Sequence, residues 1–449
     1  MAEIGLNIAV SGLDAQQVAM DTVAENLSNA NTPGYVSESA NLTTAYGGDL
    51  LGVGAGVHVT GVNQASAGLM LTNNQQAQGA LAQSTSLQQV LTEAQTSFPE
   101  PSTSGFGAQL SSFWQSWDAI NQNPSALAPR TEVVNAAQNL VTSLQQMSSQ
   151  LAQLQGNAQG QLTSTITQAN TLLQQVAQIN QQILNVQGQG ATANSLIDQR
   201  NQLANELATS IGAVARTQPD GTATIAIGGI ALVSGSTAAS LTLSGGPGNL
   251  QLIDSQNGVA VPASSGSAAG LMAAINQYLP AYQSQLNSIA TTLASTVNGQ
   301  LAAGYTATGA SGAGYPLFQG NSAGTLSVNP ALLSNPQLIA ASSTSTMPDA
   351  TNNGDNAQAM ASLYNVAGGP DQLYQALVQN VGSQVQSINT QVQGQTSVAN
   401  AAKQNLQAVA GVNTDSEMVA MLGFQQAYQA SAKLISSINT MVQSLMSSI

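Results

Sequence analysis

The last thirty residues of this chain carry an apolar stripe that only a helix can present on one face. One row repeats every seven residues and consists of Met421, Tyr428, Ile435, Val442 and Ile449. A second row follows three residues after members of the first and consists of Phe424, Ile438 and Leu445, with Ser431 as its polar interruption. This spacing predicts a helix that packs lengthwise against other helices.

A matching stripe occupies the first thirty residues. Its members are Leu6, Val10, Leu13, Met20 and Leu27, and Gln17 and Ala24 interrupt it. We therefore expect a helix over residues 2–28 that packs on the C-terminal helix and on the same helices of neighbouring copies. The predicted seam is the set Leu6, Val10, Leu13, Met20, Leu27, Met421, Phe424, Tyr428, Ile435, Ile438, Val442 and Leu445.

Composition constrains what such a chain can bind. Hydrophobic residues make up 43% of the 449 positions, whereas charged residues make up 5%, against roughly 25% in ordinary globular proteins. A surface of Gln, Asn, Ser and Thr lets neighbouring copies pack without strong repulsion, although compositional drift across a lineage would give the same texture. The net charge is −14, which argues against binding to nucleic acid or to an anionic membrane surface.

The sequence offers little material for an active site. It contains no cysteine, which excludes disulfides, thiolate nucleophiles and cysteine-bound zinc. His58 is the only histidine, and its place in a predicted strand favours a structural role. Asp198 and Glu206 lie eight residues apart on one predicted helix, where a solvated face is a simpler interpretation than a pair of glycosidase carboxylates. We expect no cofactor, no metal and no enzymatic activity.

Helical periodicity recurs along most of the interior. Helices are expected over residues 68–97, 106–121, 129–187, 193–211, 267–303, 355–366, 371–408 and 414–447. The third is a coiled-coil-like rod, because its apolar residues recur at steps of three and four for about 45 residues. Pro280 is expected to kink the fifth. Phe113, Trp114 and Trp117 share helical spacing, which is more typical of a core anchor than of a ligand platform.

Two segments between these helices differ from them in amino-acid composition. Residues 213–262 are rich in Gly, Thr, Val and Ile, and Gly228-Gly229 separates two alternating runs, which predicts a small β-rich module. Residues 304–353 are rich in Gly, Ser and Ala, so we expect an irregular surface segment. Residues 36–56 look loop-like, and residues 57–62 alternate as a short strand.

The predicted fold is mainly α with a small β-rich portion, elongated, with long antiparallel helices from paired N- and C-terminal segments. We expect a terminal helical assembly domain of residues 1–56 plus 409–449. A helical shaft domain would take residues 57–212, 263–303 and 354–408. Residues 213–262 would form the β-rich module, and 304–353 the irregular segment.

Both chain ends also carry family-like motifs. Residues 9–35 read AVSGLDAQQVAMDTVAENLSNANTPGY and residues 411–449 read GVNTDSEMVAMLGFQQAYQASAKLISSINTMVQSLMSSI. These resemble the terminal signatures of flagellar axial proteins, which include rod, hook and hook-associated proteins. Three interior stretches narrow the resemblance to the FlgK family of hook-associated proteins. They are Phe113-Trp114 with Trp117, residues 195–203 (SLIDQRNQL) and residues 354–357 (GDNA).

The resemblance implies a structural subunit that joins hook to filament. Its implied partners are other copies of itself, the hook protein, a second junction protein, the type III export apparatus and a chaperone at the C-terminal helix. It also implies an extracellular location in the flagellum, reached without a cleaved signal peptide, which agrees with the absence of a signal-like start. The alternatives are another hook or rod subunit, or an axial protein with cell-wall hydrolase activity. Larger relatives carry an outer domain where this chain has residues 304–353.

Overall fold

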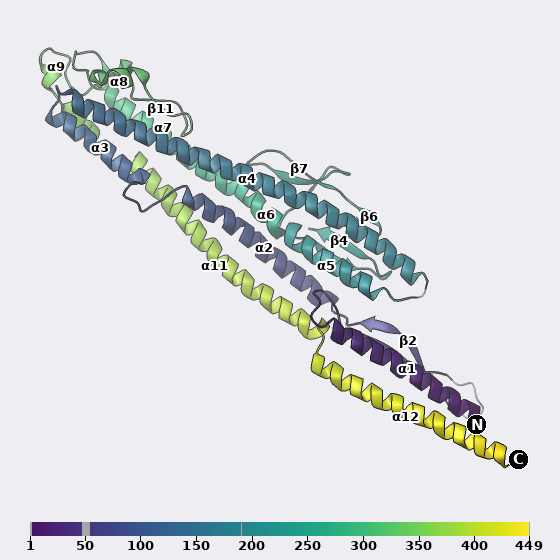
Figure 1. Cartoon of the computed structure of the whole chain (residues 1–449). Coiled ribbons are helices and arrows are strands. Elements are labelled where there is room, and N and C mark those ends of the chain that lie inside the picture. The colour runs from purple at the N-terminus through teal and green to yellow at the C-terminus, as the bar shows by residue number, and fades with distance from the viewer. Residues whose placement is uncertain (1, 47–53, 190, 449) are drawn as a thin grey trace.

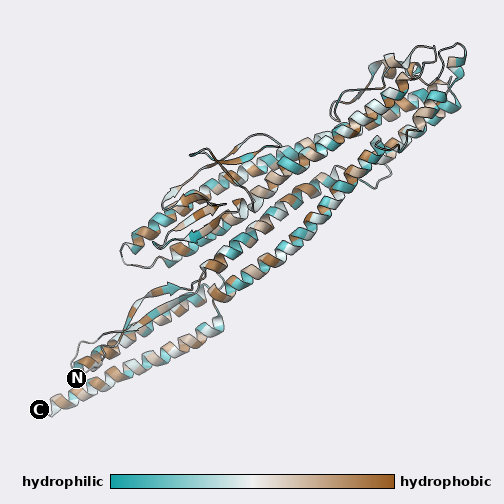
Figure 2. Cartoon of the chain, turned by 180° about the vertical axis from the view of Figure 1, so that it is seen from behind, coloured by the Kyte–Doolittle hydropathy of each residue, from teal (hydrophilic) through white to brown (hydrophobic). Residues whose placement is uncertain are grey.

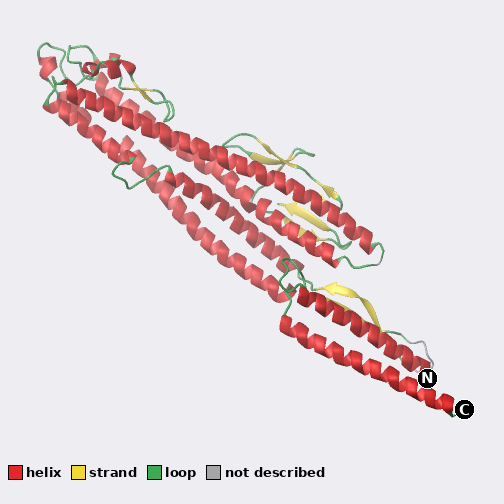
Figure 3. Cartoon of the chain, in the orientation of Figure 1, coloured by secondary structure: helices red, strands yellow, loops and turns green. Residues whose placement is uncertain are grey.

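The computed structural model describes residues 2–46, 54–189 and 191–448 and shows a long, narrow molecule built mainly of helices (Figures 1 and 3). Both chain ends lie at one tip, because α1 (Ala2–Ser28) and α12 (Thr414–Ser447) run side by side in opposite directions. The mainly α, elongated fold class predicted from the sequence is confirmed. Ile449 and the glycines 47, 48 and 52 lie outside the described residues.

A β-hairpin accompanies the terminal helices. Strand β1 (Glu38–Thr44) pairs antiparallel with β2 (Val57–Gln64), and both strands contact α1. We call α1, β1, β2 and α12 the terminal unit. The hairpin corrects two expectations: residues 38–44 form a strand rather than loop, and β2 lies on α1 although residues from 57 onward were assigned to the shaft. The sequence of β1, ESANLTT, is mostly polar, so a search for alternating apolar and polar residues does not find this strand.

The shaft consists of long helices together with two short ones, α6 and α10. They are α2 (Gly68–Thr96), α3 (Phe106–Gln122), α4 (Leu127–Gln187), α5 (Asn194–Ile211), α6 (Gly266–Ala273), α7 (Leu279–Ala302), α10 (Asp355–Ala361) and α11 (Pro370–Ala410). Each falls where periodicity predicted a helix. Helix α4 runs without a break through Gly156 and Gly160, because its stripe is buried on both sides of them. A π-helical turn, Ala274–Tyr278, joins α6 to α7 just before Pro280.

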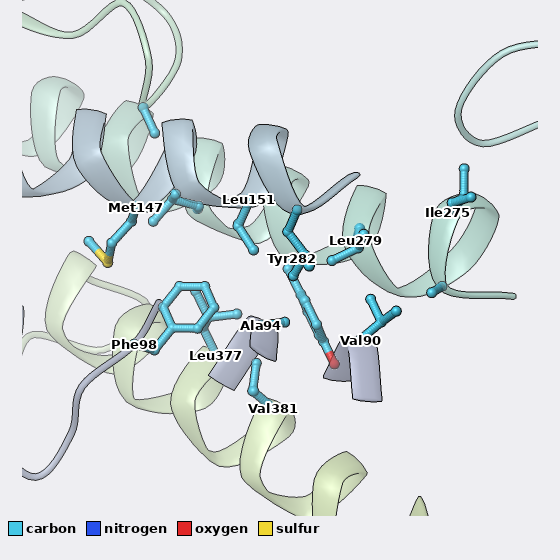
Figure 4. Packing of buried hydrophobic residues seen from close by; sticks show 14 of the residues in the cluster. Val90, Ala94, Phe98, Met147, Leu151, Ile275, Leu279, Tyr282, Leu377 and Val381 are labelled. Atoms are coloured by element: carbon cyan, nitrogen blue, oxygen red, sulfur yellow. The ribbon is translucent and has the colours of Figure 1, made fainter. Parts of the chain in front are cut away.

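The shaft core is a continuous seam of apolar side chains. Figure 4 shows Tyr282 reaching between Val90 and Ala94 of α2, with Leu377 and Val381 of α11 beside them. The Tyr282 hydroxyl donates a hydrogen bond to the side-chain oxygen of Gln384, so the one polar atom of that ring is satisfied. Phe113, Trp114 and Trp117 are fully buried in the same core, which confirms their role as an anchor.

The β-rich module lies on the side of α4 and α5 (Figure 3). A four-stranded antiparallel sheet holds β3 (Val214–Thr217), β4 (Ala223–Ile227), β5 (Ile230–Ser234) and β6 (Thr237–Ala238). A three-stranded sheet holds β7 (Leu241–Ser244), β8 (Gln251–Asp254) and β9 (Val259–Val261). Gly228 and Gly229 turn β4 into β5 with φ of 54° and 89°, values that suit glycine in a two-residue hairpin turn.

Asparagines, of which Asn26 and Asn180 are fully buried, attach the extended segments to the helices. Five helical asparagines each accept a hydrogen bond from the N–H, and donate one to the C=O, of a single extended residue: Asn26 with Glu38, Asn170 with Leu241, Asn180 with Ala223, Asn276 with Leu250, and Asn298 with Phe318. We call these amide clamps. A neutral amide satisfies both backbone groups without burying a charge, which suits a chain so poor in charged residues.

Residues 304–353 are not the irregular surface that composition predicted. They form short elements: a 3₁₀ turn (Gly312–Gly314), β10 (Phe318–Gln319), β11 (Ser327–Val328), α8 (Pro330–Ser334), a second 3₁₀ turn (Pro336–Leu338) and α9 (Asp349–Asn352). Leu317, Leu326, Leu332 and Ile339 are fully buried. The segment is therefore a packed cap on the end of the shaft far from the chain termini (Figure 1).

Candidate assembly interface

Helices α1 and α12 meet through a row of small residues on α1. A Cβ placed on Gly5 would lie 3.2 Å from Ile438 Cδ1, and one placed on Gly12 would lie 3.1 Å from Ser431 Oγ. Further along the pair, Asn26 Nδ2 donates to Glu417 Oε1 at 3.1 Å. Each move of seven or fourteen residues forward along α1 corresponds to an equal move backward along α12. The two helices therefore keep one antiparallel register over these three contacts.

This contact differs from the one that the apolar stripes suggested. The Leu13 and Met20 stripe was expected to face α12, but the closest approach runs through Gly5 and Gly12, one position earlier on α1. Ser431 does not break the α12 row: it is the residue small enough to face Gly12. The same register places Ala19 opposite Phe424. Glycine and alanine let helix backbones approach closely, so a heptad row of small residues was the signal that a search for large apolar residues missed.

The hairpin covers another face of α1. Ser11 Oγ accepts a hydrogen bond from Val57 N at 3.3 Å, and a Cβ on Gly56 would collide with Ser11. Ala9, Ala15, Ala19 and Val23 are buried on α1 between the hairpin and α12. Helix α1 is thus the buried member of the terminal unit, and α12 is its outer layer.

The predicted seam remains largely open to solvent in the isolated chain. Val10, Leu27, Tyr428, Val442 and Leu445 are exposed, and the other seven members are partly exposed. No residue between Thr414 and Ser447 is buried. The structure therefore gives seven members of the seam partial cover, among them Ile438 against Gly5 of α1, and it leaves the other five exposed in the isolated chain.

Sequence reasoning also missed part of the apolar surface of α12. Met418, Val419, Leu422, Leu434, Met441 and Met446 are exposed, with Val419 at 70% and Met446 at 75% of full exposure. Figure 2 shows apolar residues recurring along the whole of α12. Exposed apolar area of this extent on one helix is typical of an interaction surface.

A polar cluster lies where the terminal unit meets the shaft. We call it the waist, and its members are Asn26, Tyr35, Glu38, Gln64, Asn194, Asp198 and Glu417. The Asn26 clamp on Glu38 lies on the terminal-unit side, where Tyr35 also donates its hydroxyl proton to Asn26 Oδ1 at 2.8 Å. On the shaft side, Gln64 Nε2 donates to Asp198 Oδ1 at 2.8 Å, and Asn194 Nδ2 donates to Val62 O at 3.0 Å.

Burial and like charges shift the titration of the waist. Desolvation raises the pKa of Asp198 to about 6, with a smaller contribution from the charge of Glu38. Desolvation also raises the pKa of Glu38. The pKa of the Tyr35 hydroxyl is raised by burial first and then by the surrounding carboxylates. The shifts share one cause, because a negative charge is costly where water has only partial access and other acids lie nearby.

The catalytic alternatives find no support in this geometry. Asp198 and Glu206 lie eight residues apart on the same helix, α5, roughly 12 Å along its axis, whereas glycosidase carboxylates flank the scissile bond from two sides. His58 lies on the exposed side of β2. Within the described residues, no three acidic or histidine side chains are grouped so as to hold a metal ion. None of the described helices combines the length and apolar character needed to cross a membrane.

Comparison with known proteins identifies the family. The family model for the flagellar hook-associated protein FlgK helical domain matches residues 91–318, about half of the chain. The model for flagella basal body rod proteins matches residues 6–35, and that for the C-terminal part of basal body rod FlgEFG proteins matches residues 403–448. The two terminal matches cover α1 and α12, which carry the predicted seam.

Individual relatives agree with these matches. The flagellar hook-associated protein 1 of Salmonella typhimurium is 32% identical over 327 residues, which cover 68% of this chain and 58% of that protein. The protein of that name in Bacillus subtilis is 25% identical and covers 96% of this chain and 95% of its own length. This chain thus spans less than two thirds of the Salmonella relative.

A solved structure has the same fold. The flagellar hook junction protein FlgK from Burkholderia pseudomallei superposes with a TM-score of 0.66 at 16% identity, covering 76% of this chain and all of that one. The family model spans half of the chain, from the shaft through the β-rich module into the cap, and it does not include the terminal signatures. The chain belongs to the FlgK family of flagellar hook-associated proteins.

Proposed function

We propose that this chain is a structural subunit of the bacterial flagellum that joins hook to filament and polymerises through its N- and C-terminal helices. The observation that supports this most directly is α12, a helix of 34 residues with no buried side chain and an apolar surface along its length. A helix with so little cover inside its own chain is suited to receive cover from neighbouring copies.

The energetics of assembly follow from that surface. If about eight large side chains become buried only on stacking, each contributes roughly 1.5–3 kcal/mol, an upper bound of about 12–24 kcal/mol. Ordering the side chains and the helix ends offsets much of this. The low charge of the chain limits repulsion between copies. The role is mechanical and non-enzymatic in this proposal: the terminal helices build the inner tube and the shaft helices extend from it.

The proposed partners are those that membership of the family suggests. We propose self-association in the axial tube, with hook protein on one side and a second junction protein on the other. Delivery by the type III export apparatus, without a cleaved signal peptide, would place the chain outside the cell. The exposed apolar face of α12 is also the surface that an export chaperone would cover before assembly. A hook or rod subunit is less well supported, because the family model matched over residues 91–318 is that of the FlgK helical domain.

We also propose a revised domain division. The terminal assembly domain comprises residues 1–64 and 409–449, so that the hairpin stays with α1. The shaft takes residues 65–212, 263–303 and 354–408, with the β-rich module at 213–262 and the cap at 304–353. The hydrophobic core cluster supports the separation of the terminal assembly domain, since its members among the described residues all lie between Val90 and Ile388. The same cluster runs on into the β-rich module and the cap, so these two are parts packed on the shaft.

Removal of residues 412–449 tests the function. The shaft should remain folded, since none of its core residues is deleted, while filament growth on hooks should be lost in a strain that depends on this chain. A point variant makes the test sharper: Val442→Glu with Leu445→Glu should also block assembly. Its matched control, Gln443→Glu with Ser444→Glu, adds the same charge to neighbouring exposed polar positions and should assemble. Filament growth with the truncated chain would refute the proposal.

A further inference from the structure

The sulfur atoms of this chain are concentrated on one helix. The chain has eleven methionines and no cysteine, so thioethers are its only sulfur groups. Four of the eleven lie on α12, and they are Met418, Met421, Met441 and Met446. A thioether is open to oxidation to a sulfoxide wherever an oxidant can reach it, so exposure decides which of these methionines can react.

Exposure singles out α12. Among the described residues, four methionines are exposed, and three of them lie on α12: Met418 at 56%, Met441 at 61% and Met446 at 75% of full exposure. The fourth is Met347 in the cap. Two others, Met147 and Met360, are buried in the shaft core. An oxidant that diffuses to the free chain therefore meets the sulfurs of α12 and of Met347 before those of the core.

The pairing of α12 with α1 explains why one end of α12 is so open. Ile438 lies against Gly5, so the antiparallel register places Met441 level with Ala2, the first described residue of α1. Met446 lies more than one helical turn further on, where the described part of α1 does not reach it. Cover for this end of α12 has to come from another molecule.

We propose that the exposed methionines of α12 form an oxidation site, at which a peroxide converts thioether to sulfoxide and thereby blocks assembly. The inference rests on the proposed function, because the modification matters only if this surface becomes buried between copies.

The reaction is an oxygen transfer to sulfur. A sulfur lone pair attacks the outer oxygen of the peroxide, so that the O–O bond breaks and an S–O bond forms. The proton of the transferred oxygen moves to the leaving oxygen, which departs as water from hydrogen peroxide or as an alcohol from an organic peroxide. The sulfur loses two electrons, and the peroxide gains them.

The product has the wrong polarity for a buried contact. A methionine thioether is flexible and apolar and adapts to the shape of a partner, whereas a sulfoxide carries a polar oxygen. Burying a polar group without a hydrogen-bond partner is costly. Each sulfoxide on α12 should therefore weaken the contact between copies by about tenfold.

Peptide mass spectrometry of the free, full-length chain after treatment with hydrogen peroxide tests the site itself. The three exposed methionines of α12 should each gain one oxygen at a rate similar to that of Met347. Met147 and Met360 should remain thioethers until urea unfolds the shaft. Oxidation of the α12 methionines as slow as that of the two core methionines would overturn the proposal. Assembly plays no part in this measurement, so its outcome is independent of the proposed function.

Co-sedimentation of the full-length chain with isolated hooks tests the consequence. After catalase has removed the peroxide, the concentration of chain that half-saturates the hooks should be at least tenfold higher than before treatment. A variant that combines Met418→Leu, Met421→Leu, Met441→Leu and Met446→Leu keeps the apolar surface without its sulfurs, so its binding should not respond to peroxide. Met347→Leu is the matched control and should respond as the wild type does.

The distribution of sulfoxides gives a readout that needs no variant. After partial oxidation, sulfoxides on α12 should be depleted in the hook-bound fraction, whereas the sulfoxide at Met347 should be equally abundant in bound and free chain. Equal abundance of the α12 sulfoxides in both fractions would overturn the proposal, and so would a loss of binding that persists in the folded Leu variant. Untreated chain that does not bind hooks would refute the proposed function, and this inference with it.

Discussion

Ser431 on α12 lies against Gly12 on α1 so closely that a Cβ on Gly12 would meet Ser431 Oγ at 3.1 Å. One methyl group fits only if the serine shifts by a few tenths of an ångström. A larger side chain must push the helices apart. The pairing of α1 with α12 thus depends on the lack of a side chain at Gly12 as much as on the apolar residues of α12.

Gly12→Leu should therefore loosen α12 without unfolding the shaft. Overpacking costs about 1–3 kcal/mol, so amide exchange in α12 should accelerate by about tenfold or more, while exchange in α4 and α7 stays unchanged. Gly423→Leu is the control, because a Cβ there meets nothing within 4 Å and the gain in helix propensity is the same. Equal exchange in the two variants would contradict the close contact between Gly12 and Ser431.

The amide clamps predict an unusual sensitivity to a single-atom change. Asn180 is fully buried and donates to both Ala223 O and Gly235 O at 2.8 Å. Asn180→Asp removes both donors and leaves a carboxylate facing two carbonyls, at a cost of about 3–5 kcal/mol in the free energy of unfolding. Asn185→Asp, on the exposed side of the same helix, should change it by about 0.5 kcal/mol or less. Urea unfolding of the two variants provides the comparison, and similar midpoints would refute the role of the clamp.

Periodicity in the sequence predicted the helices well, because each long helix buries one face and repeats it. Val176, Ile183 and Leu173 are all buried on α4 as their spacing required. The same test could not find β1, whose residues are mostly polar and whose partner β2 lies beyond a glycine-rich stretch. Pairing between strands that are separated in sequence depends on tertiary structure, which a local sequence pattern does not predict.

The candidate interface was predicted less completely than the fold. The seam on α12 could be read from Phe424, Ile435 and Ile438, since large apolar residues mark a helix face. The complementary face on α1 is marked by Gly5 and Gly12, which a hydrophobicity pattern treats as gaps. The cap at residues 304–353 escaped for a related reason, because irregular segments bury single side chains with no period.

Asp371 should give the shaft a pH-dependent stability. Its carboxylate accepts from Trp114 Nε1 at 3.0 and 3.2 Å, and burial raises its pKa above the ordinary 3.8. A raised carboxyl pKa means that the folded state holds the proton more tightly. Its contribution to stability is therefore fully present below pH 3.8 and is lost as the pH rises through the folded pKa.

Asp371→Asn keeps an acceptor for the indole and removes this titration. The unfolding free energy of the wild type, measured relative to this variant, should fall as the pH is raised through the acid range and then level off. Both tryptophans lie in the core, so urea unfolding can be followed by their fluorescence. Asp118→Asn, at an exposed position of α3, serves as control. A difference of the opposite slope would show that the indole bond outweighs desolvation.

Arg130 should hold the cap to the shaft. It is fully buried, donates to Ile339 O at 2.6 Å and to Pro124 O at 2.9 and 3.3 Å, and burial lowers its pKa to about 10. Arg130→Met leaves the buried Ile339 carbonyl without this donor, at a cost of about 1–3 kcal/mol, and the partly exposed Pro124 carbonyl loses it as well. The loss is partly offset because no charge is then buried. We expect a net loss of about 2 kcal/mol in urea unfolding and faster proteolysis within residues 304–353. Arg216→Met, at an exposed position, should change neither. Unchanged proteolysis of a folded Arg130→Met would mean that the apolar core of the cap, from Leu317 to Ile339, holds it in place without the guanidinium.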